Sequence, residues 1–176
     1  GPDYAESAGR GIWYDGDTLS AAIGQSYNSF TPLQISVYLS TLINGGTRYS
    51  AHLLYCVKSF SGELIYKPEP AVLNTVPVSA ENIEILKNAM KSAAENGSAS
   101  RLFSNYPIEM GGKTGTAQVS SKKSDNALFM AFAPYDIPEL AVTCVIEQGA
   151  NGTDAGEAVK DIFDYYFKVG GYKQTE

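Results

Sequence analysis

The pattern of hydrophobic and polar positions divides the chain into a largely helical first part and a strand-rich last part. In the first part, apolar residues recur at helical spacing over residues 31–44 and 79–96. The first of these segments begins with Thr31-Pro32-Leu33-Gln34, which combines a capping hydroxyl, a proline suited to the first helical turn and a glutamine that can bond back to the cap. Ser79 is placed to cap the second segment. The sequence therefore predicts two amphipathic helices.

The segments around these helices have shorter or irregular patterns. Residues 4–16 mix Gly, Asp, Ser and Tyr without a period, which predicts an irregular leading segment, and residues 17–25 suit a short helical turn at most. Residues 53–66 alternate as strands do on either side of Ser61-Gly62, which predicts a hairpin. Residues 98–103 are expected to add one further helical turn.

Three strands are predicted in the last part, over residues 108–119, 127–133 and 140–148. Short links join them, which favours an antiparallel meander. The third strand is almost continuously apolar, so helices are expected to cover both faces of the sheet. A closing helix is predicted from Thr153-Asp154 as far as Gly170-Gly171, with its apolar residues on one face.

The composition of the chain narrows its class. With 176 residues, of which 44% are hydrophobic and 18% charged, it is long enough for one folded domain with a sizeable core. The net charge is −6 and the only basic cluster is Lys122-Lys123, so nucleic acid is not expected as a partner. No apolar run approaches the length of a membrane span, and the first residues lack the layout of a signal peptide. Gly1-Pro2 resemble the residues that remain after a protease removes an expression tag.

Cysteine and histidine offer little chemistry. Cys56 and Cys144 lie far apart in unlike contexts, and Cys144 falls inside an apolar run. A buried free thiol is the commoner explanation for such a cysteine, with a disulfide as the alternative. The single histidine, His52, has no partner at metal-ligand spacing, so we expect neither a metal site nor a cofactor.

Residues 111–118, Gly-Gly-Lys-Thr-Gly-Thr-Ala-Gln, carry the most specific candidate chemistry. They place a fixed cation and two hydroxyls among residues with little side chain. Glycine inside a strand usually marks a bulge or the close approach of a ligand or a second backbone. Lys113 would then meet a negative charge on that ligand. Lys-Thr-Gly is one of three signatures of β-lactamases and penicillin-binding proteins, although by itself it also fits a glycine-rich turn with a solvated lysine.

Several further segments, taken in order, resemble the class B penicillin-binding proteins. These are Ile-Gly-Gln (23–25), Thr-Pro-Leu-Gln (31–34), Asn-Gly-Gly (44–46), Lys-Thr-Gly-Thr-Ala-Gln (113–118), Asn-Ala-Leu-Phe (126–129) and Ala-Pro (133–134). The leader at residues 13–18 is most similar to the elongation type, penicillin-binding protein 2, which cross-links side-wall peptidoglycan. The resemblance runs from about residue 13 to residue 167. Ser26, Ser98 and Leu128 depart from it, since the family usually has glycine, threonine and tryptophan there.

The resemblance implies an α/β (α+β) fold of the serine D,D-peptidase or β-lactamase-like type, in which helices flank an antiparallel sheet. Residues 1–176 are expected to be the C-terminal part of a penicillin-binding transpeptidase domain, with three sheet strands and the closing helix. Two strands of the sheet would then lie outside this chain. The strand near Leu140 is therefore expected to have an unpaired edge.

The family's nucleophilic Ser-x-x-Lys and its Ser-x-Asn precede Lys-Thr-Gly, and we expect residues 1–112 to supply neither. Literal matches follow Lys113 instead, at Ser120-Ser121-Lys122-Lys123 and Ser124-Asp125-Asn126. We reject both, because they have the wrong chain order and lie in a polar link that cannot hold a nucleophile and a base in reactive geometry. The nucleophile is thus expected outside this chain, which is expected to be inactive alone.

In the reaction that the resemblance implies, a serine attacks the carbonyl between the two terminal D-alanines of a stem peptide. Lys113 would supply the positive field over this site, and the Thr116 amide would be one oxyanion donor, so both are candidate catalytic residues. The hydroxyls of Thr114 and Thr116 would bind the substrate carboxylate, and Gly115 would keep the face of the strand clear. Gln118 and Phe129 are interpreted as structural. Gly24 and Gln25 are interpreted as residues that shape their loop. Tyr27 and Asn28 could line the rim of the substrate cleft.

The partners that the resemblance implies are a stem peptide ending in D-Ala-D-Ala, β-lactam antibiotics, the upstream part of the same domain and the cell-elongation machinery. It also implies a location at the extracytoplasmic face of the bacterial cell membrane. Two alternatives stay open from the sequence. One is a non-catalytic module that binds β-lactams or stem peptides as a sensor, and the other is an unrelated mixed α/β domain with a chance Lys-Thr-Gly.

Overall fold

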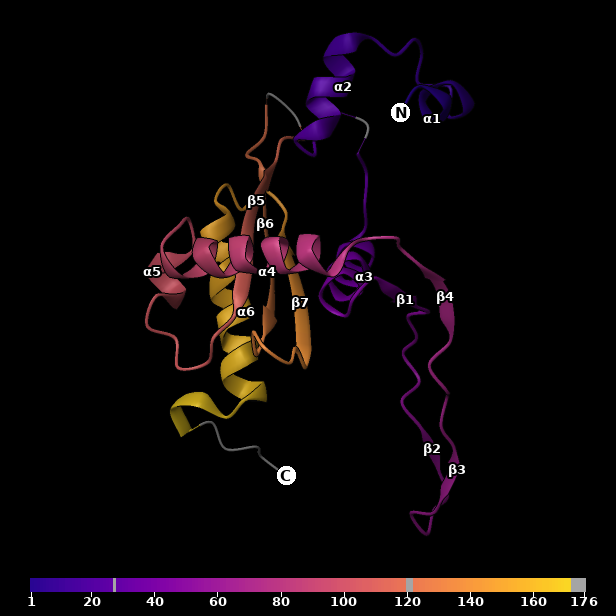
Figure 1. Ribbon diagram of the computed structural model, residues 1–176, viewed down its shortest axis with the longest axis vertical. Helices are drawn as coiled ribbons and strands as arrows, with labels where there is room; N and C mark the ends of the chain where they lie inside the picture. Colours follow the sequence, from indigo (N-terminus) through magenta and orange to yellow (C-terminus); the bar gives the residue numbers. More distant parts are fainter. Residues whose placement is uncertain (27, 120–121, 172–176) are drawn as a thin grey trace.

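The computed structural model of the chain describes residues 1–26, 28–119 and 122–171. Its centre is a three-stranded antiparallel sheet of β5 (Gly111–Ala117), β6 (Asn126–Ala133) and β7 (Leu140–Ile146), in the order β5-β6-β7 (Figure 1). The three predicted strands and their meander are confirmed: β5 and β7 are shorter than predicted by a few residues, and β6 begins one residue earlier. β5 and β7 each pair with β6 on one side, so each is an edge of this sheet.

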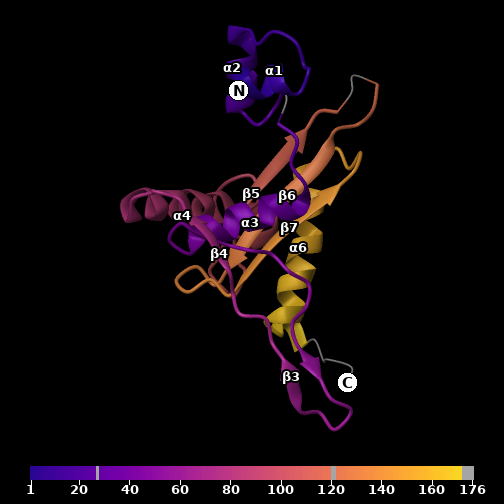
Figure 2. The same cartoon turned by 90° about the vertical axis from the view of Figure 1, so that its right-hand side faces the viewer.

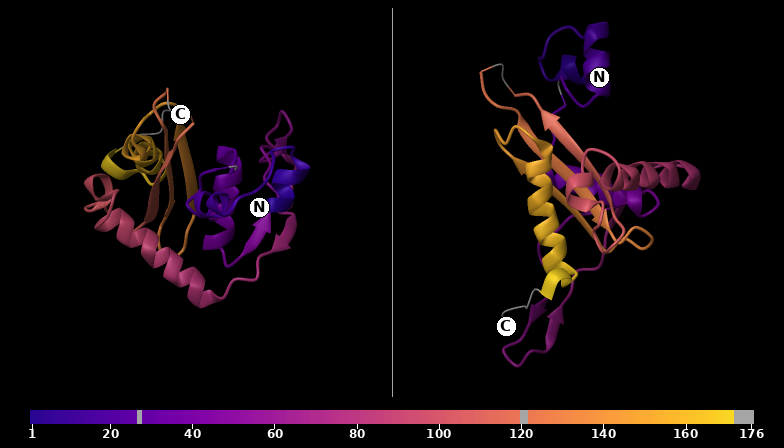
Figure 3. Two further views of the ribbon diagram at one scale, coloured as in Figure 1. Left: turned by 90° about the horizontal axis from the view of Figure 1, so that it is seen from above. Right: turned by 90° about the vertical axis from the view of Figure 1, so that its left-hand side faces the viewer.

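Helices cover both faces of the sheet, as predicted. The alternation of β6 side chains defines the two faces. Phe129 packs with Val159 of α6 (Gly152–Tyr166), whereas Phe132 packs with Leu39 of α3 (Pro32–Ile43) and Met90 of α4 (Ala80–Glu95). All five side chains are buried. Figure 3 shows the sheet with α6 on one side and α3 on the other, and with α4 crossing from one side to the other.

The two predicted helix caps are confirmed. The Thr31 hydroxyl accepts a hydrogen bond from the Gln34 amide at 3.2 Å, and the Gln34 side chain accepts one from the Thr31 amide at 2.8 Å. This reciprocal pair satisfies two amides that a helix start leaves free. Ser79 caps α4 in the simpler way, with its hydroxyl accepting from the Asn82 amide at 3.2 Å. Local sequence thus fixes where α3 and α4 begin.

The N-terminal segment is more helical than predicted. Residues expected to be irregular form α1 (Pro2–Ser7), and the expected single turn is the eight-residue α2 (Asp15–Ala22). At the start of α2 the Tyr14 amide donates to the Asp17 carboxylate at 2.9 Å. This polar contact, rather than an apolar period, marks the start of α2, whereas α1 has no side-chain cap and begins at a proline. Neither start is visible in the hydrophobic pattern. Both predictions for this segment are therefore wrong.

A long hairpin arm links α3 to α4 and extends away from the sheet (Figure 2). The predicted hairpin is confirmed as β2 (Val57–Lys58) paired with β3 (Leu64–Tyr66). The structure adds a second pair that the sequence did not predict, β1 (Thr47–Tyr49) with β4 (Val72–Thr75).

The remaining elements extend α4 and α6. α5 (Ser100–Phe103) is the predicted extra turn after α4. The closing helix α6 ends at Tyr166, before its predicted end, and a short 3-10 turn, η1 (Val169–Gly171), follows it. Cys56 and Cys144 are both free thiols. Within the described ranges, no helix combines the length and the apolar character that a membrane span needs.

Candidate functional site

The predicted site residues lie together on the open edge of β5. The strand starts in the core, because Gly111 and Gly112 are buried, and it becomes accessible along its length. Lys113 and Thr116 are exposed, and Thr114 and Gly115 are half-buried. No other strand of the described sheet covers this edge. The second half of β5 is therefore an accessible ribbon that a ligand can reach.

The three glycines of β5 have different physical roles. A Cβ atom on Gly111 would lie 2.4 Å from Cε1 of Phe132, and one on Gly112 would lie 3.0 Å from Cζ of Phe129. These two glycines make room for the protein's own aromatic core, so their interpretation as marks of ligand approach is wrong. A Cβ on Gly115 would meet only the Leu128 side chain, at 3.2 Å. Gly115 alone leaves one face of the strand clear.

The ammonium group of Lys113 folds round the free edge. It donates to the Thr114 carbonyl oxygen at 2.9 Å and lies 3.4 Å from the Thr114 hydroxyl. Successive side chains of a strand point to opposite faces, so Lys113 must bend across the edge to reach this hydroxyl. Among the salt bridges of the described residues, none includes Lys113. The edge thus has a cation that can meet an anionic ligand.

The hydroxyl of Thr114 is held from the other side. It shares a hydrogen bond of 2.9 Å with the Ser98 hydroxyl, in the link between α4 and α5. Gly152, at the start of α6, packs beside the Thr114 side chain, because a Cβ there would be 3.1 Å from Cβ of Thr114 and 2.8 Å from the Gly115 carbonyl oxygen. Thr114 is therefore fixed in orientation, whereas no side chain among the described residues forms a hydrogen bond to the exposed Thr116 hydroxyl.

The Thr116 backbone points away from the sheet. Its carbonyl oxygen accepts a hydrogen bond of 3.2 Å from the Gln25 carboxamide, which comes from the loop after α2. The N–H and C=O of one strand residue point to the same side, so the Thr116 amide also faces the open edge. Gln25 was interpreted as shaping its loop, and that interpretation missed this contact. The two residues are 91 positions apart, and no local pattern links them.

One sequence prediction about serine motifs needs correction. Residues 1–112 do contain a literal Ser-x-Asn, at Ser26-Tyr27-Asn28. Tyr27 lies outside the described residues. The Ser26 hydroxyl donates to the Asp17 carboxylate at 3.4 Å, and the Asn28 carboxamide donates to the Ala21 carbonyl at 2.9 Å. Both side chains thus hold the loop to α2, and neither forms a hydrogen bond to β5.

The literal motifs after Lys113 have no support as a catalytic centre. Ser120 and Ser121 lie outside the described residues. The Asn126 side chain accepts a hydrogen bond from the Gln148 amide at 3.0 Å, which joins the start of β6 to the end of β7. This is a structural role. Phe129 is structural as well, because its ring is fully buried and stacks on Phe103 with centroids 5.6 Å apart.

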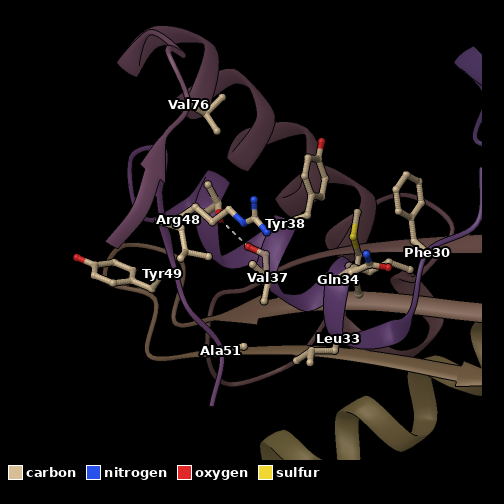
Figure 4. Close-up of a pocket in the computed structure, with 13 residues that line it drawn as sticks. Phe30, Leu33, Gln34, Val37, Tyr38, Arg48, Tyr49, Ala51 and Val76 are labelled. Carbon is tan, nitrogen blue, oxygen red and sulfur yellow. Dashed lines mark hydrogen bonds between the residues drawn. The ribbon is translucent and has the colours of Figure 1, made fainter. Parts of the chain in front are cut away.

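An apolar pocket lies elsewhere, between α3, β1 and β4 (Figure 4). It has a volume of about 660 Å³. Figure 4 shows Phe30 and Leu33 at one end and Tyr49 and Val76 at the other. Its lining is mainly apolar, with Arg48 as the charged exception, and it contains no nucleophile paired with a base. A second pocket of about 230 Å³ includes Asn28 and Trp13. Neither pocket includes a residue of β5.

Tyr135, beside α4, is a buried titratable group with a shifted pKa. Burial, together with its hydrogen bond to the Glu84 carboxylate, raises the pKa of Tyr135 to about 12. The hydroxyl lies 2.8 Å from Glu84 and 2.9 Å from the Asn88 side-chain oxygen. Lys87 and Lys91 lie over the ring, at 4.7 and 5.0 Å from its centroid. This cluster joins β6 to α4 and has no contact with the open edge.

Metal chemistry has no candidate site in the part of the chain that the structure describes. No group of three Cys, His, Asp or Glu side chains lies close enough together there to hold an ion. The open edge of β5 instead offers a cation, hydroxyls and outward amides, which are groups that bind carboxylates and stabilise oxyanions.

Residues 3–164 match the family model for the penicillin binding protein transpeptidase domain, so the chain belongs to this family. Among its curated relatives are two peptidoglycan D,D-transpeptidases MrdA. The one from Haemophilus influenzae is 34% identical over 175 residues, covering 88% of this chain and 26% of the relative. The one from Escherichia coli K12 is 32% identical over 169 residues, covering 87% of this chain and 26% of the relative. This chain spans about a quarter of the length of these relatives.

Solved structures confirm the fold class and the likeness to penicillin-binding protein 2. Pseudomonas aeruginosa PBP2 in complex with WCK 5153 has a TM-score of 0.75 at 28% identity, covering 94% of this chain and 37% of that chain. A chain of a peptidoglycan synthase complex has a TM-score of 0.83 at 28% identity, covering 99% of this chain and 29% of that chain. The imipenem acyl-enzyme complex of penicillin-binding protein A from M. tuberculosis has a TM-score of 0.73 at 25% identity, covering 84% of this chain and 33% of that chain.

Proposed function

We propose that this chain is the substrate-recognition part of a peptidoglycan D,D-transpeptidase, and that its β5 edge binds the end of a stem peptide that terminates in D-Ala-D-Ala. The observation that carries the proposal is the composition of this edge. Lys113 is a cation without an ion pair among the described residues, the Thr116 backbone faces outward, and Gly115 leaves the face clear. A peptide with a terminal carboxylate matches these groups in charge and shape.

Each residue of the edge has a defined role in this proposal. Lys113 provides the positive field that attracts the terminal carboxylate, and the Thr114 and Thr116 hydroxyls bind its oxygens. The hydrogen bond from Ser98 supports this role for Thr114, because it fixes the orientation of the hydroxyl. The Thr116 amide donates to the oxyanion that develops during attack. Loss of one such donor typically slows acyl transfer on the order of a hundredfold or more.

The reaction is acyl transfer through a serine ester. The serine oxygen attacks the carbonyl carbon of the penultimate D-alanine, and the amide bond to the terminal D-alanine breaks as that residue leaves with a proton. An amine from a neighbouring strand then attacks the ester and releases the serine. A β-lactam undergoes the same first attack, in which its ring amide opens. The acyl-enzyme reported for the mycobacterial relative supports this chemistry by likeness.

The serine belongs to an upstream part of the same domain. Residues 1–112 contain no Ser-x-x-Lys, and the matches after Lys113 are in the wrong order. Residues 1–176 then form the C-terminal part of the transpeptidase domain, and the upstream part pairs with the free edge of β7. The free side of β7 and the apolar pocket beside α3 support this arrangement.

The longer protein acts at the extracytoplasmic face of the bacterial cell membrane, together with the cell-elongation machinery. Its likeness to the MrdA relatives and to a chain of a peptidoglycan synthase complex supports this placement. The substrate also supports it, because peptidoglycan is cross-linked outside the cytoplasm.

Fluorescent penicillin labelling tests the proposal. The isolated chain should stay unlabelled, whereas the longer protein, or this chain mixed with the upstream segment, should be labelled on the upstream serine. Lys113→Met should reduce labelling of the longer protein at least tenfold, because a hydrogen-bonded charge is lost. Lys58→Met, on the exposed hairpin arm, is the matched control. Covalent label on the isolated chain would show that the nucleophile lies within it and would overturn the proposal.

A sensor module is the alternative function. It is favoured by the same absence of Ser-x-x-Lys from residues 1–112. In that case penicillin or a stem peptide should bind the longer protein reversibly, with saturation in calorimetry but without covalent label. Labelling of the longer protein excludes this alternative.

A further inference from the structure

The Gln25 side chain is presented to β5 by a preset loop. Gly24 and Ser26, on either side of it, have positive φ values of 83° and 63°. The Gln25 amide donates to the Ser20 carbonyl at 3.0 Å, and Asn28 ties the far side of the loop to α2 at 2.9 Å. A non-glycine residue such as Ser26 adopts this backbone region only when its surroundings impose it. The position of Gln25 is thus built into the loop.

The group that Gln25 contacts is one that an added strand also needs. An extended peptide that joins an antiparallel edge bonds to the N–H and the C=O of the same edge residue. At Thr116 both groups point outward, and the Gln25 carboxamide already donates to the carbonyl at 3.2 Å. A carboxamide N–H is chemically equivalent to the backbone N–H of an incoming peptide. Gln25 therefore occupies the hydrogen-bonding position of a ligand.

We infer that Gln25 competes with the acyl donor for the Thr116 carbonyl and so sets the apparent affinity of the β5 edge for extended, amide-bearing ligands. This inference rests on the function proposed above. The Thr114 carbonyl is filled in a similar way by Lys113, at 2.9 Å. In the ligand-free protein both outward carbonyls of this stretch are therefore satisfied by side chains of the same chain, which protects an otherwise open edge.

The contact is weak enough for a ligand to displace. It is a single hydrogen bond between neutral groups, and α2 packs on no other helix or strand of the described part of the chain. A neutral hydrogen bond of this kind shifts an equilibrium by about fivefold. If a ligand binds only after Gln25 has left, its apparent affinity is its intrinsic affinity multiplied by the fraction of molecules in which the Thr116 carbonyl is free.

The rate constant for acylation of the longer protein by a fluorescent penicillin tests this inference. Gln25→Ala should raise the second-order rate constant by about fivefold, because the carbonyl is then free before the ligand arrives. Gln25→Asn should do the same, since its carboxamide is one methylene too short to reach Thr116. Asn105→Ala removes an exposed carboxamide from the loop after α5 and should leave the rate unchanged.

The outcomes separate this inference from the proposed function. If the wild-type longer protein is not acylated at all, the proposed function fails. If it is acylated but both Gln25 variants react at the wild-type rate or more slowly, Gln25 either stabilises the β5 edge or has no effect on acylation. Either result overturns the inference that Gln25 competes with the ligand. Circular dichroism of each variant checks that folding is intact, and the two substitutions serve as independent tests.

Discussion

Glycines three or four positions apart in one strand can have opposite roles, as β5 shows. Gly111 and Gly112 lie where any side chain would enter the rings of Phe132 and Phe129. Gly115 lies where a side chain would meet the Leu128 side chain and otherwise extend over the open face. The first pair makes room for the core, and the proposed function assigns the face beside Gly115 to the ligand. Substitutions at the two ends of the strand should therefore separate stability from binding.

Gly115→Val should abolish ligand docking with little effect on folding. The branched side chain suits a strand and has room beside Leu128 after a small adjustment, but it covers the face that Gly115 leaves clear. We expect penicillin acylation of the longer protein to fall at least tenfold, with a melting temperature close to that of the wild type. Undiminished acylation would contradict the assignment of this face to the ligand.

Gly111→Ala should instead destabilise the chain. Its methyl group would lie 2.4–2.6 Å from two ring carbons of Phe132, which overpacks a closely filled core. Such changes typically cost about 1–3 kcal/mol. Urea unfolding should show this loss, whereas Gly16→Ala, in open space on α2, should be neutral or slightly stabilising. Equal stability of Gly111→Ala and the wild type would mean that the ring moves aside freely.

At the scale of elements, α4 is tied to the sheet by one buried polar group. The hydroxyl of Tyr135, just beyond β6, reaches Glu84 and Asn88 of α4, and its ring lies beneath Lys87 and Lys91. Apolar packing through Met90 and Phe132 holds the same two elements together. The polar contact fixes how α4 crosses the sheet and makes this junction sensitive to alkaline pH.

The alkaline stability of the chain should depend on Tyr135. Burial raises its pKa in the folded state to about 12, against about 10 in the unfolded chain. The stabilisation is thus complete below pH 10 and is lost as the pH rises towards 12, at up to about 1.4 kcal/mol per pH unit. Tyr135→Phe should unfold with a shallower dependence on pH over this range in urea titrations. Tyr66→Phe, on the exposed β3, is the matched control.

At the scale of the whole molecule, the described residues leave several surfaces without partners. β7 pairs with β6 alone, and the residues along it are mostly half-buried. The pocket beside α3 carries exposed apolar side chains, among them Phe30, Leu33 and Tyr38. A free strand edge next to an apolar surface is a template for association with another chain.

The isolated chain should therefore associate with itself at roughly micromolar concentrations and above. Because Thr116 points outward from β5, the alternation of paired residues across the sheet places the Thr143 amide on the free side of β7. Thr143→Pro removes this donor and should lower the association measured by sedimentation velocity. A monodisperse wild-type chain at these concentrations would contradict the prediction. Addition of the upstream segment should replace self-association with a one-to-one complex.

The sequence by itself determined the elements whose signals are local. Caps at Thr31 and Ser79 and the apolar periods that follow them fixed α3 and α4, and the apolar runs after residue 107 fixed the three strands. The order of short motifs was enough to identify the family, which the match over residues 3–164 confirmed. These features depend on residues close together in the chain, so a single sequence displays them.

The tertiary structure alone decided which groups meet at the edge of β5. The contact of Gln25 with Thr116, the bond of Ser98 to Thr114 and the pairing of β1 with β4 join residues far apart in sequence. It also decided that Gly111 and Gly112 face the core while Gly115 faces outward. The physical reason is that orientation and contact depend on the packing of the whole sheet between its helices, and no local spacing of residue types encodes that packing.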